Sequence, residues 1–389
     1  MTLAAPSRSQ DNKLVNPPFA VDRMYRAVGQ NDFRGESRNM AWDPVIGGMV
    51  VLPRSTAGRN PRTLFPGGKS PKGSVVGTYT SQPQKAEFEF HEILPSWNLL
   101  VDEETQGYRV YVRVAGRDRE WSPWIYFGGG GILLKEPNPN RSRIVPGWGT
   151  VRVDYIMLEK AALYFQYRVE LKSAGPKSAT GQRRMALVRF FLSYSNTSGD
   201  RELWETSDHP KRASFAPETT TSLGIPYRCQ GWVEDRKLAS QICCPTSLAM
   251  ILEKYGINKP TTEVAAEVLD KENSIYGNWP RTAQVAARYG FEAHVERFRR
   301  HEDVQRLIAN GFPVMASIRI TKGDLGTEPQ RASGGHLILL QGFTKEGDYI
   351  VNDPDSPGPG GAERIFSRQD LQNVWIDKGG VGIVYQKSK

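Results

Sequence analysis

Apolar and polar residues alternate along the middle of the chain, in segments about as short as β-strands. Because neighbouring side chains of a strand point to opposite faces, this alternation predicts strands with one buried face. A glycine run at 128–131 and a Pro-Asn repeat at 137–140 separate them as turns. Several such strands joined by turns predict an antiparallel all-β sandwich over residues 85–196. The clearest period of two is found in segments 108–114, 150–155, 164–171 and 186–192.

The pattern changes after residue 222, where helical periods alternate with short apolar runs. Because most helices come first and the strands gather later, we expect an α+β domain with an antiparallel sheet over residues 223–389. The helical period predicts helices over 245–255, 261–269, 281–289, 302–310 and 369–375. The apolar runs predict strands over 291–298, 313–320, 336–343, 349–352 and 381–385.

Two other segments lack a regular period. Residues 1–84 are rich in Gly, Pro, Ser, Arg and Asn, which predicts an irregular arm and long loops. Residues 197–222 are polar and contain prolines and a run of threonines, which predicts a linker. A chain of 389 residues is longer than one core usually spans, so we expect two globular domains.

Cys243 begins the segment with the clearest chemistry, Cys-Cys-Pro-Thr-Ser. Proline is common in the first turn of a helix, so Pro245 predicts that Cys243 lies at or just before a helix N-terminus. The N–H groups and partial positive charge there stabilise a thiolate. Only one of two adjacent thiols can face a cleft, so Cys244 is expected to point elsewhere. The alternative is that both are small buried hydrophobic residues.

A histidine and an acid follow in order along the chain. His336 comes after two glycines and begins an apolar run, and Asp353 lies in Asn-Asp-Pro at the end of the next predicted strand. An imidazole can hold a thiol as thiolate, and a carboxylate behind the ring fixes its tautomer. The structural alternatives are an ordinary strand histidine and a turn-forming aspartate.

Acyl transfer also needs a hydrogen-bond donor for the oxyanion that forms on the attacked carbonyl. Two glutamines precede the cysteine, Gln230 and Gln241. Gln241 is only two residues from the thiol, which makes it hard for its side chain to turn back over the sulfur. Gln230 is therefore the better candidate.

These motifs resemble those of the papain-like cysteine peptidases, and among them the bacteriocin-processing (double-glycine) peptidases and their stand-alone relatives. The resemblance covers the α+β region and implies a papain-like fold. It implies these roles: Cys243 as nucleophile, His336 as general base, Asp353 as orienting acid and Gln230 as oxyanion donor. Two features depart from the family pattern: Cys244 follows the nucleophile where glycine or serine is common, and the glutamine lies farther from the cysteine.

The function expected is that of a thiol hydrolase, a cysteine peptidase acting on a peptide or protein substrate, with no metal or organic cofactor. One alternative passes the acyl group to an amine instead of water, because the triad does not choose the acceptor. A second is a non-catalytic peptide- or glycan-binding protein. A third is a metal site, which the absence of paired Cys-x-x-Cys spacing disfavours; its ligands would be Cys229, Cys243, Cys244 and His336.

Charge and composition limit the kinds of partner and location that the sequence favours. The 51 basic and 42 acidic residues give a net charge of +9, but the basic residues are scattered and form no stripe typical of a nucleic-acid module. Residues 1–30 lack the apolar core of an export signal, and no apolar stretch is long enough to span a membrane. Three cysteines do not determine the compartment.

Tryptophans gather in the predicted sandwich. Exposed aromatic rings at strand ends can stack on a cell-surface glycan or a peptide, whereas buried rings fill the core. Both interpretations stay open from the sequence, and the four residues concerned are Trp97, Trp121, Trp124 and Trp148.

Overall fold

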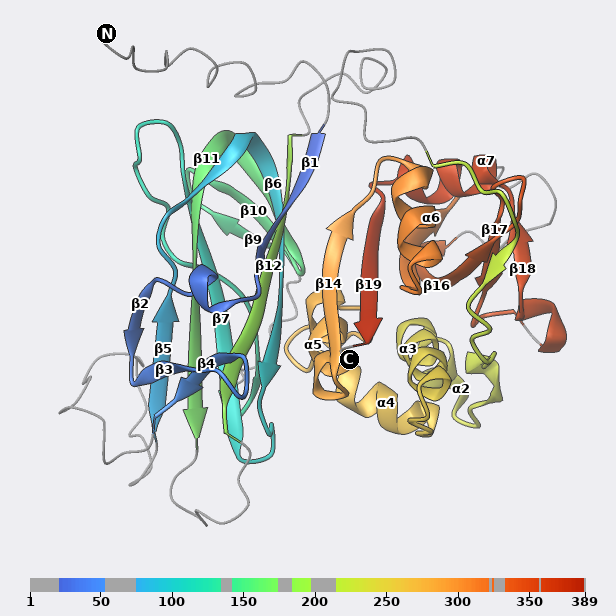
Figure 1. Cartoon of the computed structure of the whole chain (residues 1–389), viewed down its shortest axis with the longest axis horizontal. Helices are drawn as coiled ribbons and strands as arrows, with labels where there is room; N and C mark the ends of the chain where they lie inside the picture. Colours follow the sequence, from blue (N-terminus) through green and yellow to red (C-terminus); the bar gives the residue numbers. More distant parts are fainter. Residues whose placement is uncertain are drawn as a thin grey trace, which may run out of the picture.

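The computed structural model describes residues 21–52, 75–133, 142–173, 184–196, 215–321, 324, 333–356 and 358–387. These residues form two antiparallel sheets, each built from one half of the chain, and the helices gather around the second sheet (Figure 1). The helix-first α+β arrangement expected after residue 222 is thus present, together with a large β-rich part before it.

The N-terminal sheet contains twelve strands within the described residues. Its central path runs β2-β5-β11-β6-β12-β4-β3, and β1 pairs with the outer side of β12. The strands are β1 (Val21–Ala27), β2 (Glu36–Arg38), β3 (Met40–Asp43), β4 (Gly48–Val51), β5 (Val76–Thr80), β6 (Gln84–Leu100), β7 (Gln106–Ala115), β8 (Ile125–Gly131), β9 (Ser142–Val145), β10 (Gly149–Arg152), β11 (Tyr155–Ser173) and β12 (Ala186–Asn196).

Two expectations for this half of the chain are wrong, one about an irregular segment and one about a strand. The segment 1–84, predicted as irregular, contains β1 to β5, while 1–20 and 53–74 lie outside the described residues. Most of these strands are only three to five residues long, which is too short to show a clear apolar period. The strand predicted over 150–155 is interrupted, because Val153 adopts φ of 49° in the turn between β10 and β11.

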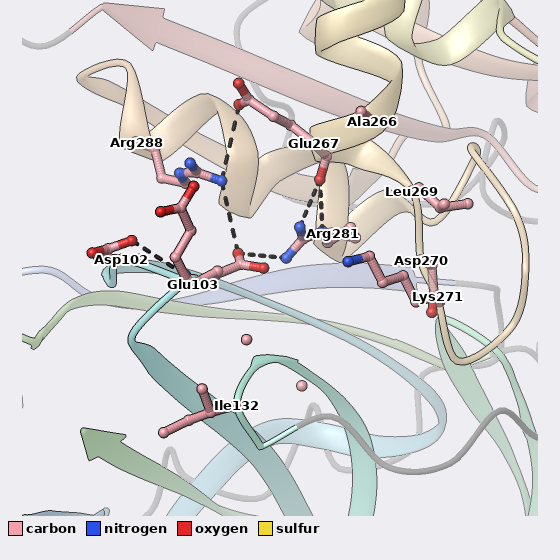
Figure 2. A pocket seen from close by; sticks show the side chains of 13 residues that line it. Asp102, Glu103, Ile132, Ala266, Glu267, Leu269, Asp270, Lys271, Arg281 and Arg288 are labelled. Carbon is pink, nitrogen blue, oxygen red and sulfur yellow. Dashed lines mark hydrogen bonds and ion pairs between the residues drawn. The ribbon is translucent and has the colours of Figure 1, made fainter. Parts of the chain in front are cut away.

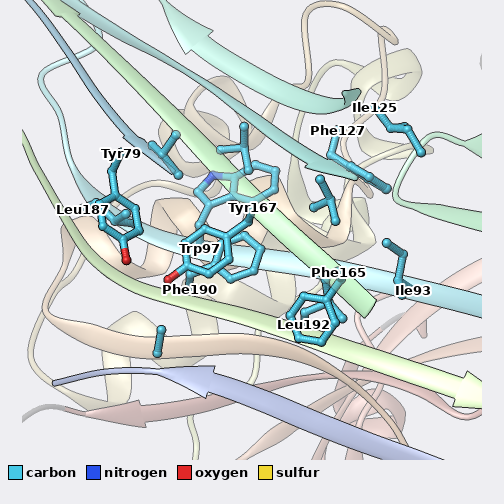
Figure 3. Close-up of a cluster of buried hydrophobic side chains, with 14 of the residues drawn as sticks. Tyr79, Ile93, Trp97, Ile125, Phe127, Phe165, Tyr167, Leu187, Phe190 and Leu192 are labelled. Atoms are coloured by element: carbon cyan, nitrogen blue, oxygen red, sulfur yellow. The ribbon is translucent and has the colours of Figure 1, made fainter. Parts of the chain in front are cut away.

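The core of the N-terminal sheet is aromatic. Trp97 is only 2% exposed and packs edge-on against Tyr108. Tyr167 stacks on Phe190 with ring centroids 3.8 Å apart, and Figure 3 shows Trp97, Tyr167 and Phe190 in this core. Trp97 is therefore a core residue and not a binding platform. Trp148 also packs against this core. Trp121 and Trp124 are partly exposed, and the Arg113 guanidinium lies 4.6 Å from each indole ring.

The C-terminal sheet runs β14-β19-β15-β16-β17-β18, and β13 pairs with β16. Thr221–Ser222, predicted as the end of a linker, thus form a strand of this sheet; 197–214 lie outside the described residues. The strands are β13 (Thr221–Ser222), β14 (Phe291–Arg297), β15 (Val314–Ile320), β16 (Ser333–Phe343), β17 (Tyr349–Asn352), β18 (Arg364–Phe366) and β19 (Val381–Lys387).

The helices after residue 222 cover both faces of this sheet. Leu337 and Leu339 of β16 pack towards α3 and α5, whereas Ile338 and Leu340 pack towards α6 and η5. A strand buried on both faces needs a continuous apolar run, which explains the sequence Leu-Ile-Leu-Leu. The helices are α2 (Arg236–Ala239), α3 (Cys243–Lys254), α4 (Thr261–Val268), α5 (Trp279–Arg288), α6 (His301–Ala309) and α7 (Arg368–Leu371), with shorter turns η1 (Gln30–Asp32), η3 (Gln230–Trp232), η4 (Gly358–Gly361) and the π-helical η5 (Gln372–Ile376). Within the described ranges, none of these helices is both long and apolar enough to span a membrane.

The two halves are joined through the edge strand β14. The Asn98 side chain of β6 bonds to both backbone groups of Ala293, donating to its carbonyl at 2.8 Å and accepting from its N–H at 3.3 Å. Conversely, the Gln284 amide of α5 bonds to the Leu99 N–H at 2.8 Å and the Leu99 carbonyl at 3.0 Å. An uncovered edge strand exposes backbone groups that recruit other strands. These buried amides satisfy such groups within the chain.

A cavity of about 440 Å³ lies at the same junction (Figure 2). Its charged groups largely pair with one another: Arg281 donates to Glu103 at 2.6 Å and to the Tyr108 hydroxyl at 3.2 Å. Arg281 also donates to the Glu267 carbonyl oxygen at 2.6 Å. These contacts add polar links between the β6–β7 turn and the α4–α5 segment.

Replacing Gln284 tests the amide contacts at the junction. Gln284→Ala leaves the buried N–H and carbonyl of Leu99 unpaired, and each orphaned group costs roughly 1–3 kcal/mol. We expect the free energy of unfolding to fall by about 2–5 kcal/mol, measured by urea denaturation of the full chain. The exposed Gln369→Ala is the control and should change it by no more than about 0.5 kcal/mol. Equal stability of both variants would contradict the role of Gln284.

Candidate active site

Cys243 is the first residue of α3 and is partly exposed, as its motif predicts. Cys244 is fully buried and points in a different direction, with its sulfur 3.2 Å from the Thr282 hydroxyl and 3.8 Å from the Met315 sulfur. Successive residues of a helix are turned by about 100°, so two adjacent thiols cannot face the same way. The core surroundings raise the pKa of the Cys244 thiol, chiefly through burial.

His336 lies near the start of β16, and Asp353 directly follows β17. The two strands pair antiparallel, which brings the start of one to the end of the other. The His336 Nε2 atom lies 2.8 Å from Asp353 Oδ1. With Nε2 directed to the carboxylate, the opposite ring nitrogen is left for the Cys243 thiol, whose pKa the neighbouring imidazole lowers. The structure therefore brings these three sequence-predicted residues together.

The pKa values of the three groups are coupled. Burial alone would raise the pKa of the Cys243 thiol, but the neighbouring His336 imidazole and nearby backbone groups outweigh it and lower the pKa below the ordinary value. For His336, burial acts to lower the pKa, but the bond to Asp353 and the neighbouring Cys243 thiol prevail and raise it to about 10. The pKa of Asp353 is lowered, because the bond to His336 overcomes the effect of burial. The arrangement favours a thiolate–imidazolium pair.

Three groups besides His336 hold the Asp353 carboxylate. Oδ1 accepts the Asp355 N–H at 3.1 Å, and Oδ2 accepts from the Ser356 hydroxyl and Arg364 Nη1, both at 3.2 Å. Arg364 lies on β18 and reaches Asp353 because β18 pairs with β17. The sequence carries no signal for this contact, since it depends on strand pairing and not on a motif.

The side chain of Asn352, in the Asn-Asp-Pro motif, forms hydrogen bonds that hold neighbouring segments together. Its Oδ1 accepts from the buried Gln341 side chain at 3.0 Å, and its Nδ2 donates to the Ile225 carbonyl at 2.9 Å. The Gln341 side chain in turn accepts the Ile225 N–H at 2.7 Å. These bonds tie β16 and β17 to the segment that leads to Gln230.

The two glutamines occupy different surroundings. The Gln230 side chain is 5% exposed and donates to Asp355 Oδ1 at 2.9 Å, two residues beyond Asp353. Gln241 is exposed and donates back to the Lys237 carbonyl of α2 at 2.9 Å. Only Gln230, of these two, is thus attached to the loop that carries the acid.

The alternative metal site is not assembled. Within the described ranges, no cluster of three or more His, Cys, Asp and Glu residues is arranged to hold a metal ion. The Cys244 sulfur lies among core residues and not beside His336.

Alkylation tests the coupled pair directly. Because His336 lowers the pKa of Cys243, its reaction with iodoacetamide should stay fast well below the ordinary thiol pKa of about 8.5. His336→Ala removes the cation, so the midpoint should move up to that value or above. Peptide mass mapping at each pH scores Cys229, Cys243 and Cys244 separately. A wild-type midpoint near 8.5 at Cys243 would contradict the pair.

Comparison with solved structures gives distant similarities to peptidases. One is a protein described as a C39-like peptidase from Bacillus anthracis, with 19% identity over 44% of this chain and 99% of that chain, and a TM-score of 0.34. Another is a double-glycine motif protease from an AMS/PCAT transporter in complex with the leader peptide, with 18% identity over 45% of this chain and 99% of that chain, and a TM-score of 0.31. Among curated proteins, none matches the chain.

The sequence model of the Peptidase_C39 like family matches residues 222–383. This range begins at β13 and contains α3, β16 and β17, and so includes all the candidate residues described above. It agrees with the resemblance noted from the motifs of the sequence. The C-terminal region of the chain is thus similar to the Peptidase_C39 like family, and this similarity supports a cysteine peptidase at the level of the family.

Proposed function

We propose that the protein is a cysteine peptidase of papain-like fold that cleaves a peptide or isopeptide bond through an acyl-enzyme on Cys243. The observation that carries this proposal is the bond of 2.8 Å between His336 Nε2 and Asp353 Oδ1, beside a Cys243 thiol whose pKa the same imidazole lowers. The family match supports a peptide as the class of substrate.

In the first half-reaction, the Cys243 thiolate attacks the carbonyl carbon of the scissile bond. A carbon–sulfur bond forms, and the carbonyl oxygen becomes an oxyanion that needs hydrogen-bond donors. Proposed donors are the Cys243 backbone N–H at the start of α3 and the Gln230 side chain. The tetrahedral intermediate collapses when His336 gives its proton to the leaving amine.

In the second half-reaction, water replaces the amine. Neutral His336 takes a proton from the water, and the resulting hydroxide attacks the thioester carbonyl. Collapse releases a carboxylic acid and restores the thiolate–imidazolium pair. Asp353 keeps its charge throughout and holds the imidazole in one orientation.

We further propose that the N-terminal half is an accessory β-sandwich joined to the peptidase domain at residues 223–389. The strands from β1 to β5 share a sheet with those of 85–196, which supports a domain start no later than residue 21. The contacts of Ser96 and Asn98 support a role in covering β14, since Asn98 bonds to Ala293 and the Ser96 hydroxyl accepts the Val295 N–H at 3.0 Å.

Serine substitutions separate the roles of the two cysteines. Cys243→Ser should abolish cleavage of a peptide library, because a serine hydroxyl is not ionised by His336 at neutral pH. Cys244→Ser keeps a small side chain next to Thr282 and should retain most activity. Mass spectrometry of the products should find free carboxylic acids. Loss of activity only in Cys244→Ser, or amide products alone, would contradict the assignment of nucleophile or of hydrolysis.

Arg364 should influence the pH at which the alkylation rate of Cys243 falls on the acid side of the pH profile, here called the acid limb. Arg364→Ala removes a cation from Asp353, so the carboxyl pKa should rise and Asp353 should lose its charge at a higher pH. Because Arg364 is partly exposed, we expect the acid limb of the alkylation profile to move up by about half a pH unit. Arg364→Lys keeps the charge and should show a smaller shift. An unchanged limb in Arg364→Ala would exclude this influence.

A further inference from the structure

The loop after β17 holds two of the candidate groups at once. Asp353 Oδ1 accepts from His336 Nε2 at 2.8 Å, and Asp355 Oδ1 accepts from the Gln230 side chain at 2.9 Å. The carbonyl of Pro354 between them accepts the Gln230 N–H at 2.8 Å. The sequence Asp-Pro-Asp therefore contacts the base through its first acid and the glutamine through its second.

The orientation of the Gln230 side-chain amide is set by a hydrogen bond from its nitrogen, not from its oxygen. Its Oε1 atom is buried and has no hydrogen-bond partner within the part of the chain that the structure describes. One N–H of Nε2 is used by Asp355, which leaves the second N–H of the amide for another acceptor. A buried amide with one fixed N–H presents the other in a defined direction.

The loop itself is tied down by several bonds. The Asp355 N–H donates to Asp353 Oδ1 at 3.1 Å, and the Asp353 N–H donates to the Gly361 carbonyl at 2.9 Å. The Tyr227 hydroxyl donates to the Asp353 carbonyl at 3.1 Å. A Cβ on Gly361 would lie 2.0 Å from the Tyr227 hydroxyl, so the close approach at this position requires glycine. Asp355 is thus held in fixed relation to Asp353.

We infer that Asp355 is a positioning residue that orients the Gln230 amide as oxyanion donor and couples that donor to the loop of the orienting acid. This inference rests on the proposed function, because it needs an acyl-transfer reaction at Cys243. Asp355 is exposed, and its carboxylate is a hydrogen-bond acceptor for Gln230 in this role. No contact of Asp355 with substrate is required.

Two reagents distinguish the oxyanion donor from the nucleophile. Iodoacetamide alkylates the thiolate by displacing iodide, and no oxyanion forms. p-Nitrophenyl acetate acylates the same thiolate: the carbon–sulfur bond forms through an oxyanion, and p-nitrophenolate leaves. A residue that only orients the oxyanion donor affects acylation and leaves alkylation unchanged.

The experiment measures both rates at Cys243 in the full chain at neutral pH. Asp355→Ala should slow acylation about tenfold or more, while alkylation stays within about twofold. Asp355→Asn keeps an oxygen acceptor for Gln230 and should restore most of the acylation rate. Gln230→Ala should lose about 10²-fold, and the Gln230→Ala/Asp355→Ala double variant should be no slower than Gln230→Ala. Glu234→Ala removes another exposed carboxylate after η3 and serves as the matched control.

Three results would overturn the inference in different ways. Acylation of Asp355→Ala at the wild-type rate would overturn it and leave the proposed function intact. Equal losses in acylation and alkylation would show that Asp355 acts on the thiolate and not on the oxyanion donor. Failure of wild-type Cys243 to be acylated while it is alkylated would overturn the proposed function, and the inference with it.

Discussion

The antiparallel pairing of β16 with β17 is the constraint on which the candidate site depends. It places Leu339 opposite Asn352, so His336 and Asp353 lie at the same edge of the sheet and meet at 2.8 Å. Side chains alternate between the faces of a strand, so a slip of one residue would turn His336 to the other face. The buried hydrogen bond from Gln341 to Asn352 opposes such a slip, because the slip would break it.

The thiol depends on the same pairing through α3. This helix packs on β16, with the Ser247 hydroxyl 3.5 Å from the Leu337 carbonyl, and its first residue thereby comes beside His336. Partial burial makes a thiolate harder to form, and the neighbouring imidazole more than compensates. The thiol pKa shifts in the opposite direction one residue later: Cys244 lies among core groups, and burial raises its pKa. Position relative to the imidazole, and not residue type, separates the two cysteines.

The N-terminal half is joined through β14 to the sheet that carries the site. That strand is the outer strand of the sheet that contains β16, and its backbone bonds to Asn98 and Ser96 of β6. Buried side-chain amides that replace a strand partner satisfy the edge without adding to the sheet. The β-rich half is therefore attached by directional bonds as well as by apolar contact among Leu94, Val295 and Val381.

The sequence by itself determined the α+β order after residue 222, the strands near 108–114, 164–171 and 186–192 and the candidate residues Cys243, His336 and Asp353, because period and motif are local properties. It did not predict the strands β1 to β5: β3 and β4 form a local hairpin of short strands, whereas β1, β2 and β5 pair with more distant segments. Burial of Trp97 and the contacts of Arg364 and Asp355 likewise came only from the tertiary structure. These features arise when strands from different parts of the chain pair, and no local pattern records which strand will be the neighbour.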